Sequence, residues 1–403
     1  METLIDLCED VRFEAYIPGA TKFILDVSKL DEDKLGNTQH NENYEWVDFT
    51  RNALEFSIDR GADLYNNNGF ARADASTLTV LSYEDDYDPE DRGAIFPGMP
   101  VRVTVKTEGF VEETPGIIEL KEVWEPVYAG KMDSLSIEYT NSGKPISTLQ
   151  ASDDVERLAN VTTFFGESQT VKERLEDIAA QTDTTINVKG GDGATLAPKE
   201  SLTNAWDIAE LAITSEGGFI FPKKDNTLEA WMREYRNNNV SINFSDIHDD
   251  DDPKHSCYSG LRVENTSERV VNTVLVTNIS ESDLNLNDIE EDLPPVKDQA
   301  SVDIYGPKEL QLKTNLVSLD DANDLSQFVL GAFATPKDSV EYIEFTPETT
   351  GFTLIDVGDN VEIVFSDVVD DTFLVSKVSH EVSPDGWNTT LGLFKRGDGT
   401  RWL

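Results

Sequence analysis

Alternation of apolar and polar residues dominates the first part of the chain, from residue 1 to about 148. A period of two is what a strand with one buried face requires. Short strands at this density predict a β-barrel or a β-sandwich. The runs that alternate in this way, each bounded by Gly, Pro, Asn or Asp, are 22–27, 54–58, 77–82, 101–106, 116–120 and 135–139.

Helical spacing replaces this alternation near residue 152. Thr170 and Glu173 form a capping box in front of apolar residues that repeat every three or four positions. A second helix is predicted to start at Ser201 and to stop at Gly217-Gly218, and a hairpin of two strands, 219–221 and 227–232, follows. The expected apolar face of this second helix is Leu202, Ala205, Trp206, Ala209, Ala212 and Ile213. We therefore predict a small α/β domain over 149–245.

An acidic linker and a second β region complete the predicted order of domains. The linker, 246–260, carries five Asp residues and Pro253. Strands resume at Leu261, and an acidic loop, 281–303, contains eight carboxylates with Lys297 as its one base. A single helix at about 319–335 lies between Ser318 and Pro336.

Three strands with turn residues between them are predicted at the end of the chain. They lie in 354–365 and 373–394, with breaks at Gly358-Asp359, at 367–371 and at Pro384-Asp385-Gly386. The predicted domains are therefore 1–148 (β), 149–245 (α/β), 246–260 (linker) and 261–403 (β with one helix).

The charge balance excludes one large class of function. Seventy-eight acidic residues against 33 Lys and Arg give the 403-residue chain a formal net charge of −45. Nucleic-acid binding needs clustered cations, and no basic stripe occurs. At molar salt the Debye length falls to about 3 Å, so such self-repulsion becomes tolerable. We interpret the acidity as adaptation to a salt-rich environment, with divalent-cation binding and simple solubility as the competing interpretations.

The cysteine count and the hydropathy of the chain indicate the cellular compartment in which the protein is made. Cys8 and Cys257 are the two cysteines, too few for a fold built on disulfides. The first residues lack a basic segment followed by an apolar run, and no window of about 18 apolar residues occurs. We expect a chain that is made in the host cytoplasm, without a signal peptide and without a membrane-spanning segment.

Four segments, in order, resemble the tail hub (baseplate hub or minor tail) proteins of long-tailed double-stranded DNA viruses. In 57–90, Arg60 stands near a strand end and a Thr-rich strand leads to an Asp-rich turn that closes in Asp-Pro; Ser76 departs from the family's usual Gly. The other three are the helix, Gly-Gly and hairpin of 201–231, the Asn-Thr-Val strand entry in 264–278, and the block 301–394.

The resemblance implies a mainly β fold, with two tail-tube-like β-barrel domains flanking the small α/β domain. It also implies a homotrimeric ring at the tail tip of a virion, which joins the tail tube to the baseplate or fibre apparatus and lines the channel for genome delivery. The implied partners are further copies of the chain, the tail tube or distal tail protein, the tape-measure protein and the tail fibre or tip proteins. The acidic composition points to a virus of a halophilic host.

Chemistry-bearing motifs are weak by comparison. The Asp run 246–252 lies near His248 and His255 but has no EF-hand spacing, so we interpret it as a solvated linker. His380 is predicted to be packed and hydrogen-bonded within a strand. A zinc-hydrolase motif, a P-loop, a nucleophile elbow and a dinucleotide fingerprint are all absent, and the Gly-rich 190–193 is interpreted as a loop tip. We therefore predict no enzyme and no catalytic, cofactor-binding or metal residue.

Two questions stay open at this level. The aromatic residues near the end of the chain belong either to the core or to an interface; they are Phe352, Phe365, Phe373, Trp387, Phe394 and Trp402. The alternative functions are a hexameric distal tail adaptor or tube-end protein, and a halophilic β-rich surface adhesin or carbohydrate-binding protein.

Overall fold

The computed structural model describes residues 10–18, 44–50, 53–61, 73–83, 97–114, 117–139, 145–235, 237, 240–245, 255–265, 267–278, 293–336, 338–347, 354–365 and 369–395. The chain forms two compact units, each assembled from separate segments. Unit 1 consists of Met1–Ser57, Leu78–Ser152 and Val382–Gly386, and unit 2 of Ile58–Thr77, Asp153–Glu381 and Trp387–Leu403. The domain boundaries expected from the sequence divide the chain differently and stay a prediction.

Unit 1 is built on antiparallel strands in the order β7-β6-β5-β1-β2. Alternation along β1 and β5 places apolar residues opposite one another, and these pairs are buried because both strands turn the same face to the core. The pairs are Val11↔Val105, Phe13↔Val103 and Ala15↔Val101. The strands are β1 (Val11–Pro18), β2 (Tyr44–Asp48), β5 (Pro100–Thr114), β6 (Ile117–Glu138) and β7 (Ile146–Ser152).

The strand β6 corrects one prediction. The runs 116–120 and 135–139 were expected as two strands, but one strand of 22 residues contains nearly all of both. It pairs antiparallel with β5 from Thr114 to Pro100, and the register shifts between Val103 and Thr104, where Pro126 is the partner of Thr104. A proline has no N–H to give to the ladder, and a bulge is where a strand tolerates it. Pairing with β5 thus keeps a strand continuous that punctuation residues appeared to break.

Unit 2 contains the strands that close the chain. β22 pairs antiparallel with β23 and parallel with β15, and β15 pairs parallel with β16. On the other side of β23 lie β24 and β21, and β21 pairs antiparallel with β17. The bounds are β15 (Val240–Ser245), β16 (His255–Ser256), β17 (Gly260–Asn265), β21 (Asp338–Phe345), β22 (Asn360–Phe365), β23 (Val369–Ser383) and β24 (Gly386–Lys395).

The three strands predicted at the end of the chain are confirmed as β22, β23 and β24. Gly358 lies in the turn before β22, and Pro384-Asp385 form the turn between β23 and β24. The break expected at 367–371 is too long, because Asp370 and Asp371 already lie in β23, opposite Val364 and Ile363 of β22. Cross-strand pairing outweighs the low strand propensity of Asp there.

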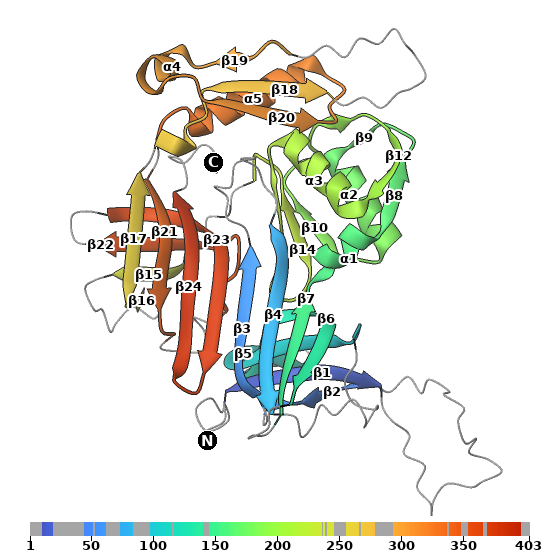
Figure 1. Cartoon of the computed structure of the whole chain (residues 1–403), viewed down its shortest axis with the longest axis vertical. Coiled ribbons are helices and arrows are strands. Elements are labelled where there is room, and N and C mark those ends of the chain that lie inside the picture. Colours follow the sequence, from blue (N-terminus) through green and yellow to red (C-terminus); the bar gives the residue numbers. More distant parts are fainter. Residues whose placement is uncertain are drawn as a thin grey trace, which may run out of the picture. The chain divides into compact units, whose positions relative to one another are not determined.

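An α/β segment follows Ser152 in the chain. A sheet of order β10-β14-β13 forms its strand layer, with helices α1, α2 and α3 beside it (Figure 1). The bounds are α1 (Asp154–Asn160), β8 (Thr162–Phe165), β9 (Gln169–Thr170), α2 (Val171–Thr182), β10 (Ile186–Lys189), β11 (Thr195–Leu196), β12 (Lys199–Asn204), α3 (Ala205–Glu216), β13 (Phe219–Pro222) and β14 (Leu228–Trp231).

The capping box of α2 is confirmed. Thr170 Oγ1 accepts a hydrogen bond from Glu173 N at 3.3 Å, and Glu173 Oε2 accepts one from Thr170 N at 2.9 Å. Two of the N–H groups at the helix start, which have no partner inside the helix, are satisfied in this way. The bond from the Thr170 backbone also lowers the pKa of Glu173.

Thr170→Ala is expected to lower the free energy of unfolding by about 1 kcal/mol, since the side-chain acceptor for Glu173 N is lost. Urea denaturation measures the change. Ser168→Ala, at an exposed position two residues earlier, serves as the control and should stay within about 0.5 kcal/mol of the wild type. Equal stability of the Thr170 and Ser168 variants would contradict the role given to this cap.

The predicted start of the next helix at Ser201 is wrong. Lys199–Asn204 is strand β12, which pairs with β8, and α3 begins at Ala205 because Asn204 Oδ1 caps Asp207 N at 2.7 Å. Leu202, expected on the apolar helix face, is 72 % exposed on the strand. The predicted stop is confirmed, since Gly217 ends α3 with φ of 71°. The short helix α1 was not predicted.

A further mixed sheet, of order β19-β18-β20, lies within the predicted final β domain. β18 and β20 run parallel, and α5 packs against β18. α5 starts after the Ser318 cap as predicted, but α4 corrects the interpretation of 281–303 as a loop. The Asp298 side chain accepts from Ser301 N at 3.0 Å and so caps a helix there. The bounds are η4 (Ser267–Arg269), β18 (Thr273–Asn278), β19 (Val296–Lys297), α4 (Gln299–Tyr305), β20 (Glu309–Thr314) and α5 (Leu319–Phe333).

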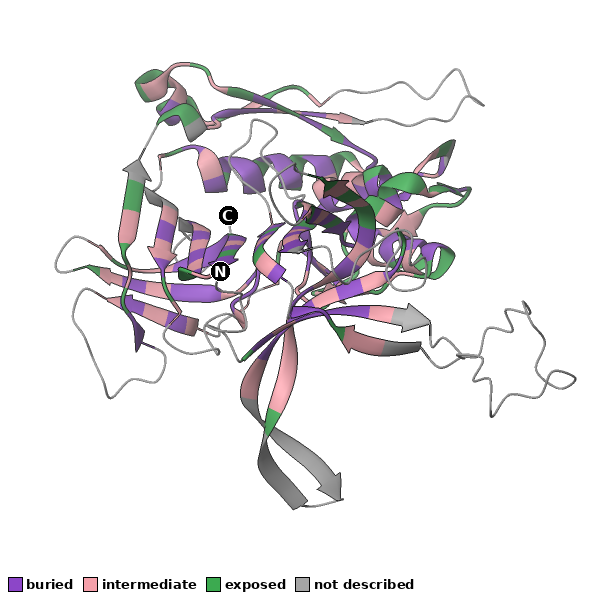
Figure 2. Ribbon diagram, turned by 60° about the horizontal axis from the view of Figure 1, so that its bottom comes forward, coloured by how far each residue is buried: buried purple, intermediate pink, exposed green. Residues whose placement is uncertain are grey.

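Buried residues run through the helices and strands, with exposed residues recurring along the same elements (Figure 2). The mainly β fold class with an inserted α/β segment is confirmed. Several predicted features lie outside the described residues: the strand 22–27, the Asp run 246–252, most of the acidic loop, Phe352 and Trp402. None of the helices in the described part of the chain has the length and hydrophobicity that crossing a membrane requires.

Candidate functional site

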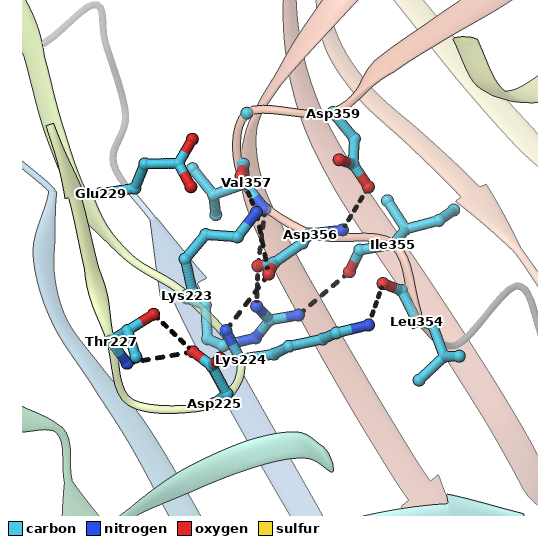
Figure 3. A network of polar contacts seen from close by, with 12 residues as sticks. Lys223, Lys224, Asp225, Thr227, Glu229, Leu354, Ile355, Asp356, Val357 and Asp359 are labelled. Carbon is cyan, nitrogen blue, oxygen red and sulfur yellow. Dashed lines mark hydrogen bonds and ion pairs between the residues drawn. The ribbon is translucent and has the colours of Figure 1, made fainter. Parts of the chain in front are cut away.

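A buried ionic network joins three segments of unit 2 that are distant in the sequence (Figure 3). The first is the end of β3 (Ala53–Gly61), which carries Arg60. The second is the turn between β13 and β14, with Lys223 and Lys224, and the third is the loop 354–359 before β22, with Asp356 at its centre. We name this group of residues the Asp356 junction.

Asp356 accepts hydrogen bonds at both carboxylate oxygens. Oδ1 accepts from Arg60 Nη1 and from Val357 N, the latter at 2.9 Å. Oδ2 accepts from Lys224 N at 3.2 Å and lies 3.1 Å from Lys223 Nζ. An ionised carboxylate offers about four lone-pair positions. Four donors therefore fill its hydrogen-bonding capacity.

The cations of the junction also bind backbone carbonyls of the same loop. Arg60 Nη2 donates to Ile355 O at 3.1 Å, Lys223 Nζ to Val357 O at 3.1 Å, and Lys224 Nζ to Leu354 O at 3.0 Å. A loop usually leaves such carbonyls to water. Here three charged side chains replace water and hold the loop in one conformation.

Burial sets the electrostatics of the junction. The side chain of Arg60 is 0 % exposed and that of Asp356 is 4 % exposed. Burial by itself would raise the pKa of Asp356, but Arg60, Lys223 and Lys224 outweigh it and hold that pKa below its usual value. Burial would likewise lower the pKa of Lys223, and the carboxylates, Asp356 first, raise it instead. Asp356 and Lys223 therefore both stay ionised, because each is stabilised by the opposite charge beside it.

Asp359 and Gly358 shape the turn that presents Asp356. Asp359 Oδ2 accepts from Asp356 N at 3.0 Å, and burial raises the pKa of Asp359. Gly358 has φ of +89°, and a Cβ there would lie 2.7 Å from Phe221 and 2.9 Å from Trp231. A residue with a side chain would therefore push the loop away from β13 and β14.

His380 occupies a second buried polar cluster in unit 2. Trp387 Nε1 donates to His380 Nδ1 at 3.3 Å, so Nδ1 is an acceptor and the Thr389 hydroxyl, 2.9 Å away, donates to it as well. Burial, followed by the charge of Arg60, lowers the pKa of His380 well below its usual value, so the ring is neutral. The prediction of a packed, hydrogen-bonded histidine is confirmed.

His380 makes the stability of the protein depend on pH. The ring is neutral when folded and takes up a proton at a pH near 6.5 when unfolded. Its contribution is therefore present above pH 6.5 and is lost as the pH falls, by up to about 1.4 kcal/mol per pH unit. We expect the stability of the wild type relative to His380→Asn, measured by urea denaturation from pH 7.5 to 5, to decrease with that sign. A constant difference would contradict a neutral buried ring.

A third buried polar contact in unit 2 is a hydrogen bond between Asp153 and Ser76. Asp153 caps α1 by accepting from Val155 N at 2.9 Å, and its other oxygen accepts from Ser76 N on β4 (Asp74–Tyr83) at 2.7 Å. Burial raises the pKa of Asp153 to about 6. The backbone N–H of Ser76 thus binds the aspartate that caps α1.

The aromatic residues, the Gly-rich loop 190–193 and His255, which the sequence also singled out, do not form a common site with these clusters. Phe373 and Trp387 are buried, whereas Phe365 is 37 % exposed, so the aromatic residues divide between core and surface. Residues 190–193 lie between β10 and β11 as a loop, as predicted. His255 is buried, and no group of His, Cys, Asp and Glu among the described residues is arranged to hold a metal ion.

Sequence reasoning identified Arg60 but missed its partners. The signal for Asp356 and Asp359 was their position around Val357-Gly358 between apolar runs, and the signal for Lys223-Lys224 was a pair of adjacent cations in a strongly acidic chain. Chemically, the arrangement fastens a strand end, a turn and a loop together. The filled lone pairs of Asp356 leave it no free acceptor position for a substrate proton.

Comparisons with known proteins identify solved structures of similar fold. No family model matches the sequence, and no curated protein matches it. Among solved structures, the chain is similar to a tail protein from Neisseria meningitidis MC58, with a TM-score of 0.60 at 13 % identity over 98 % of each chain. It is also similar to the 43 kDa tail protein of prophage MuSo2 from Shewanella oneidensis, with a TM-score of 0.53 at 11 % identity over 96 % of this chain and 98 % of that one. At these identities the similarity shows a shared fold.

Proposed function

We propose that the protein is a structural component of a viral tail tip. In this proposal it forms a ring that joins the tail tube to the baseplate or fibre apparatus and lines the channel through which the genome passes. The observation that carries the proposal is the extent of the match, 98 % of this chain and 98 % of a tail protein. The four sequence segments that resemble tail hub proteins support it independently.

The Asp356 junction supports a mechanical role. Three cationic side chains, three backbone carbonyls and two backbone N–H groups take part in holding one loop, and the central ion pair is sealed from water. Removing one member of a buried ion pair is strongly destabilising, so such a junction resists partial opening. A subunit that transmits force between a tube and a tip needs segments that do not separate under load. We place no catalytic residue in it.

The finer features of the proposal come from the family resemblance. We propose a homotrimer in the virion tail, which contacts the tail tube or distal tail protein, the tape-measure protein and the tip or fibre proteins. With a net charge of −45, a channel lined by this chain would repel phosphates, so DNA would pass without binding. The same acidity suits a virus whose host lives at high salt.

The mass of the assembly tests the proposal. We expect sedimentation equilibrium and mass photometry in molar salt to give three subunits, with a smaller assembly at low salt because the like charges are then screened less. Rings in negative-stain images of the same sample would support the trimer. Six subunits would favour a hexameric adaptor, and a monomer at every salt concentration would overturn the proposed ring.

A further inference from the structure

One face of the unit 1 sheet carries aromatic and arginine side chains that the core does not use. Val11, Phe13 and Val103 of β1 and β5 are buried in the core, so the residues between them along each strand lie on the opposite face. We name that opposite face the Trp46–Trp124 face. The register places its residues opposite one another on neighbouring strands, as Arg12↔Thr104, Glu14↔Arg102, Glu14↔Asp48, Tyr16↔Trp46 and Lys106↔Trp124.

The exposure of the tryptophans distinguishes this face from the rest of the described chain. Trp206, Trp231 and Trp387 are buried. The two other tryptophans that the structure describes, Trp46 and Trp124, are half-buried, and both lie on this face. Half-buried Tyr16 lies beside Trp46, with the ring centroids 5.1 Å apart. Tryptophan, tyrosine and arginine are the residue types that dominate the binding energy of protein–protein interfaces.

Each of these two tryptophan rings is covered on one side by a guanidinium. Arg12 Cζ lies 3.8 Å from the ring centroid of Trp124, and Arg102 Cζ lies 4.0 Å from that of Trp46. At these distances the rings attract the cations and hold the guanidinium planes in place. A nucleic-acid base binds such rings by stacking, and it would find one side of each ring already occupied.

The Nη groups of both arginines are unused within the described part of the chain. Arg102 Nε donates to Glu14 Oε2 at 2.8 Å, and Arg12 Nε lies 3.6 Å from Asp48 Oδ2. Neither arginine has an acceptor for its Nη groups among the described residues, and the two side chains are 41 % and 31 % exposed. A guanidinium held at Nε and open at Nη presents a fork that fits a carboxylate.

The local charges favour a second copy of the chain as the occupant. The cations of the face lie beside carboxylates, so the face is close to neutral; the pairs are Arg12–Asp48, Arg102–Glu14 and Lys106–Glu122. A carboxylate that approaches the open Nη groups is therefore attracted without meeting a strongly acidic surface. The described surface of the same chain supplies exposed carboxylates, such as Glu176 on α2 and Asp320 on α5.

We propose that the Trp46–Trp124 face is one side of a contact between two copies of this chain, in which carboxylates of the second copy bind the Nη groups of Arg12 and Arg102. The contact is heterologous, because the face of one copy meets a different, acidic surface of the next, and contacts of this kind generate rings. High salt screens the repulsion between distant charges, whereas ion pairs buried at the contact are screened much less. This inference rests on the proposed ring and names one surface through which the ring closes.

Arg12→Lys combined with Arg102→Lys tests the contact, because lysine keeps each charge but lacks the fork. In sedimentation equilibrium of the full chain in molar salt, we expect the dissociation constant of the assembly to rise about tenfold or more. Arg157→Lys is the matched control and should assemble like the wild type. Its side chain is 31 % exposed, as that of Arg102 is, and it lies on α1 in unit 2. Urea denaturation of each variant shows whether the fold is kept.

Fluorescence quenching tests the same contact with the face unchanged. Trp402→Phe removes the sixth tryptophan of the chain, so that quenching by acrylamide reports mainly on Trp46 and Trp124, since the other three are buried. We expect quenching to decrease as the protein concentration is raised and the copies assemble. Quenching that stays the same during assembly would contradict a contact at this face.

The failure of this inference can be distinguished from the failure of the ring. A wild type that is monomeric at every salt concentration would overturn both. An assembly that the double lysine variant forms with the dissociation constant of the wild type would overturn the contact and leave the ring in place. Binding of an oligothymidylate by the wild type, lost in the double variant, would assign the face to a nucleic acid and would also overturn the contact.

Discussion

Asp356→Asn is expected to lower the free energy of unfolding by about 3–5 kcal/mol, because it leaves Arg60 as a buried cation without its counter-charge. The Arg60 side chain is 0 % exposed, so water cannot replace the lost carboxylate. Lys223 would lose its ion pair in the same step. Urea denaturation followed by tryptophan fluorescence measures the change.

Asp225→Asn is the matched control for Asp356. Asp225 lies on the neighbouring turn, where its Oδ1 accepts from Thr227 N at 3.0 Å at an exposed position. An amide oxygen can accept the same bond, so the control should cost less than about 1 kcal/mol. If Asp356→Asn cost no more than Asp225→Asn, the ionic character of the junction would be irrelevant to stability.

A double-mutant cycle separates the pair from its surroundings. Arg60→Met combined with Asp356→Leu should be less destabilising than the sum of the single changes, because no lone charge of the pair is then left buried.

The contribution of Asp356 to the free energy of unfolding depends on pH with a known sign. Asp356 has a lowered pKa in the folded protein, so its contribution is present above pH 3.8 and is lost as the pH falls through the folded pKa.

Gly61→Ala is the second change with a large expected effect, about 2–5 kcal/mol or loss of the folded state. Gly61 has φ of +98°, and a Cβ there would lie 2.1 Å from the backbone oxygen of Ser376. Positive φ costs a residue with a Cβ about 1–2 kcal/mol, and overpacking adds about 1–3 kcal/mol. The clash cannot be relieved by a side-chain rotation, because the opposing atom belongs to the backbone of β23.

Gly98→Ala isolates the backbone part of this cost. Gly98 has a similar φ of +93°, but no heavy atom lies within 4 Å of a Cβ built there. This variant should therefore lose about 1–2 kcal/mol at most. Denaturation curves of both variants give the cost of the close approach as a difference, and equal losses would show that β3 and β23 are not as close as described.

The need for glycine can be predicted from the sequence at position 98 but not at position 61. Gly98 follows Pro97, a pair of residues typical of turns. Gly61 is the last residue of β3 and follows an arginine, and nothing near it in the sequence indicates that β23, more than 300 residues later, will pass within contact. The requirement for glycine at 61 is a property of the packed strands.

The concentration of cations at the Asp356 junction has a similar origin. The chain has 33 Lys and Arg against 78 acidic residues, and three of those cations surround one aspartate. The sequence resemblance located Arg60 at a strand end, and the structure supplied the reason for an arginine there. Its guanidinium reaches Asp356 and the carbonyl of Ile355 together, which a lysine ammonium could not match in geometry.

The sequence by itself determined the local features of this protein: the alternating strands, the capping box at Thr170, the stop at Gly217 and the mainly β class. Each of these depends on residues a few positions apart, so spacing and propensity suffice to identify it. Tertiary structure alone decided that 199–204 is a strand, that β6 is continuous, and that β3, the 223–227 turn and the 354–359 loop meet at Asp356. Those outcomes depend on partners supplied from distant parts of the chain, and the hydrogen bonds and burial that favour them exist only once these parts have packed together.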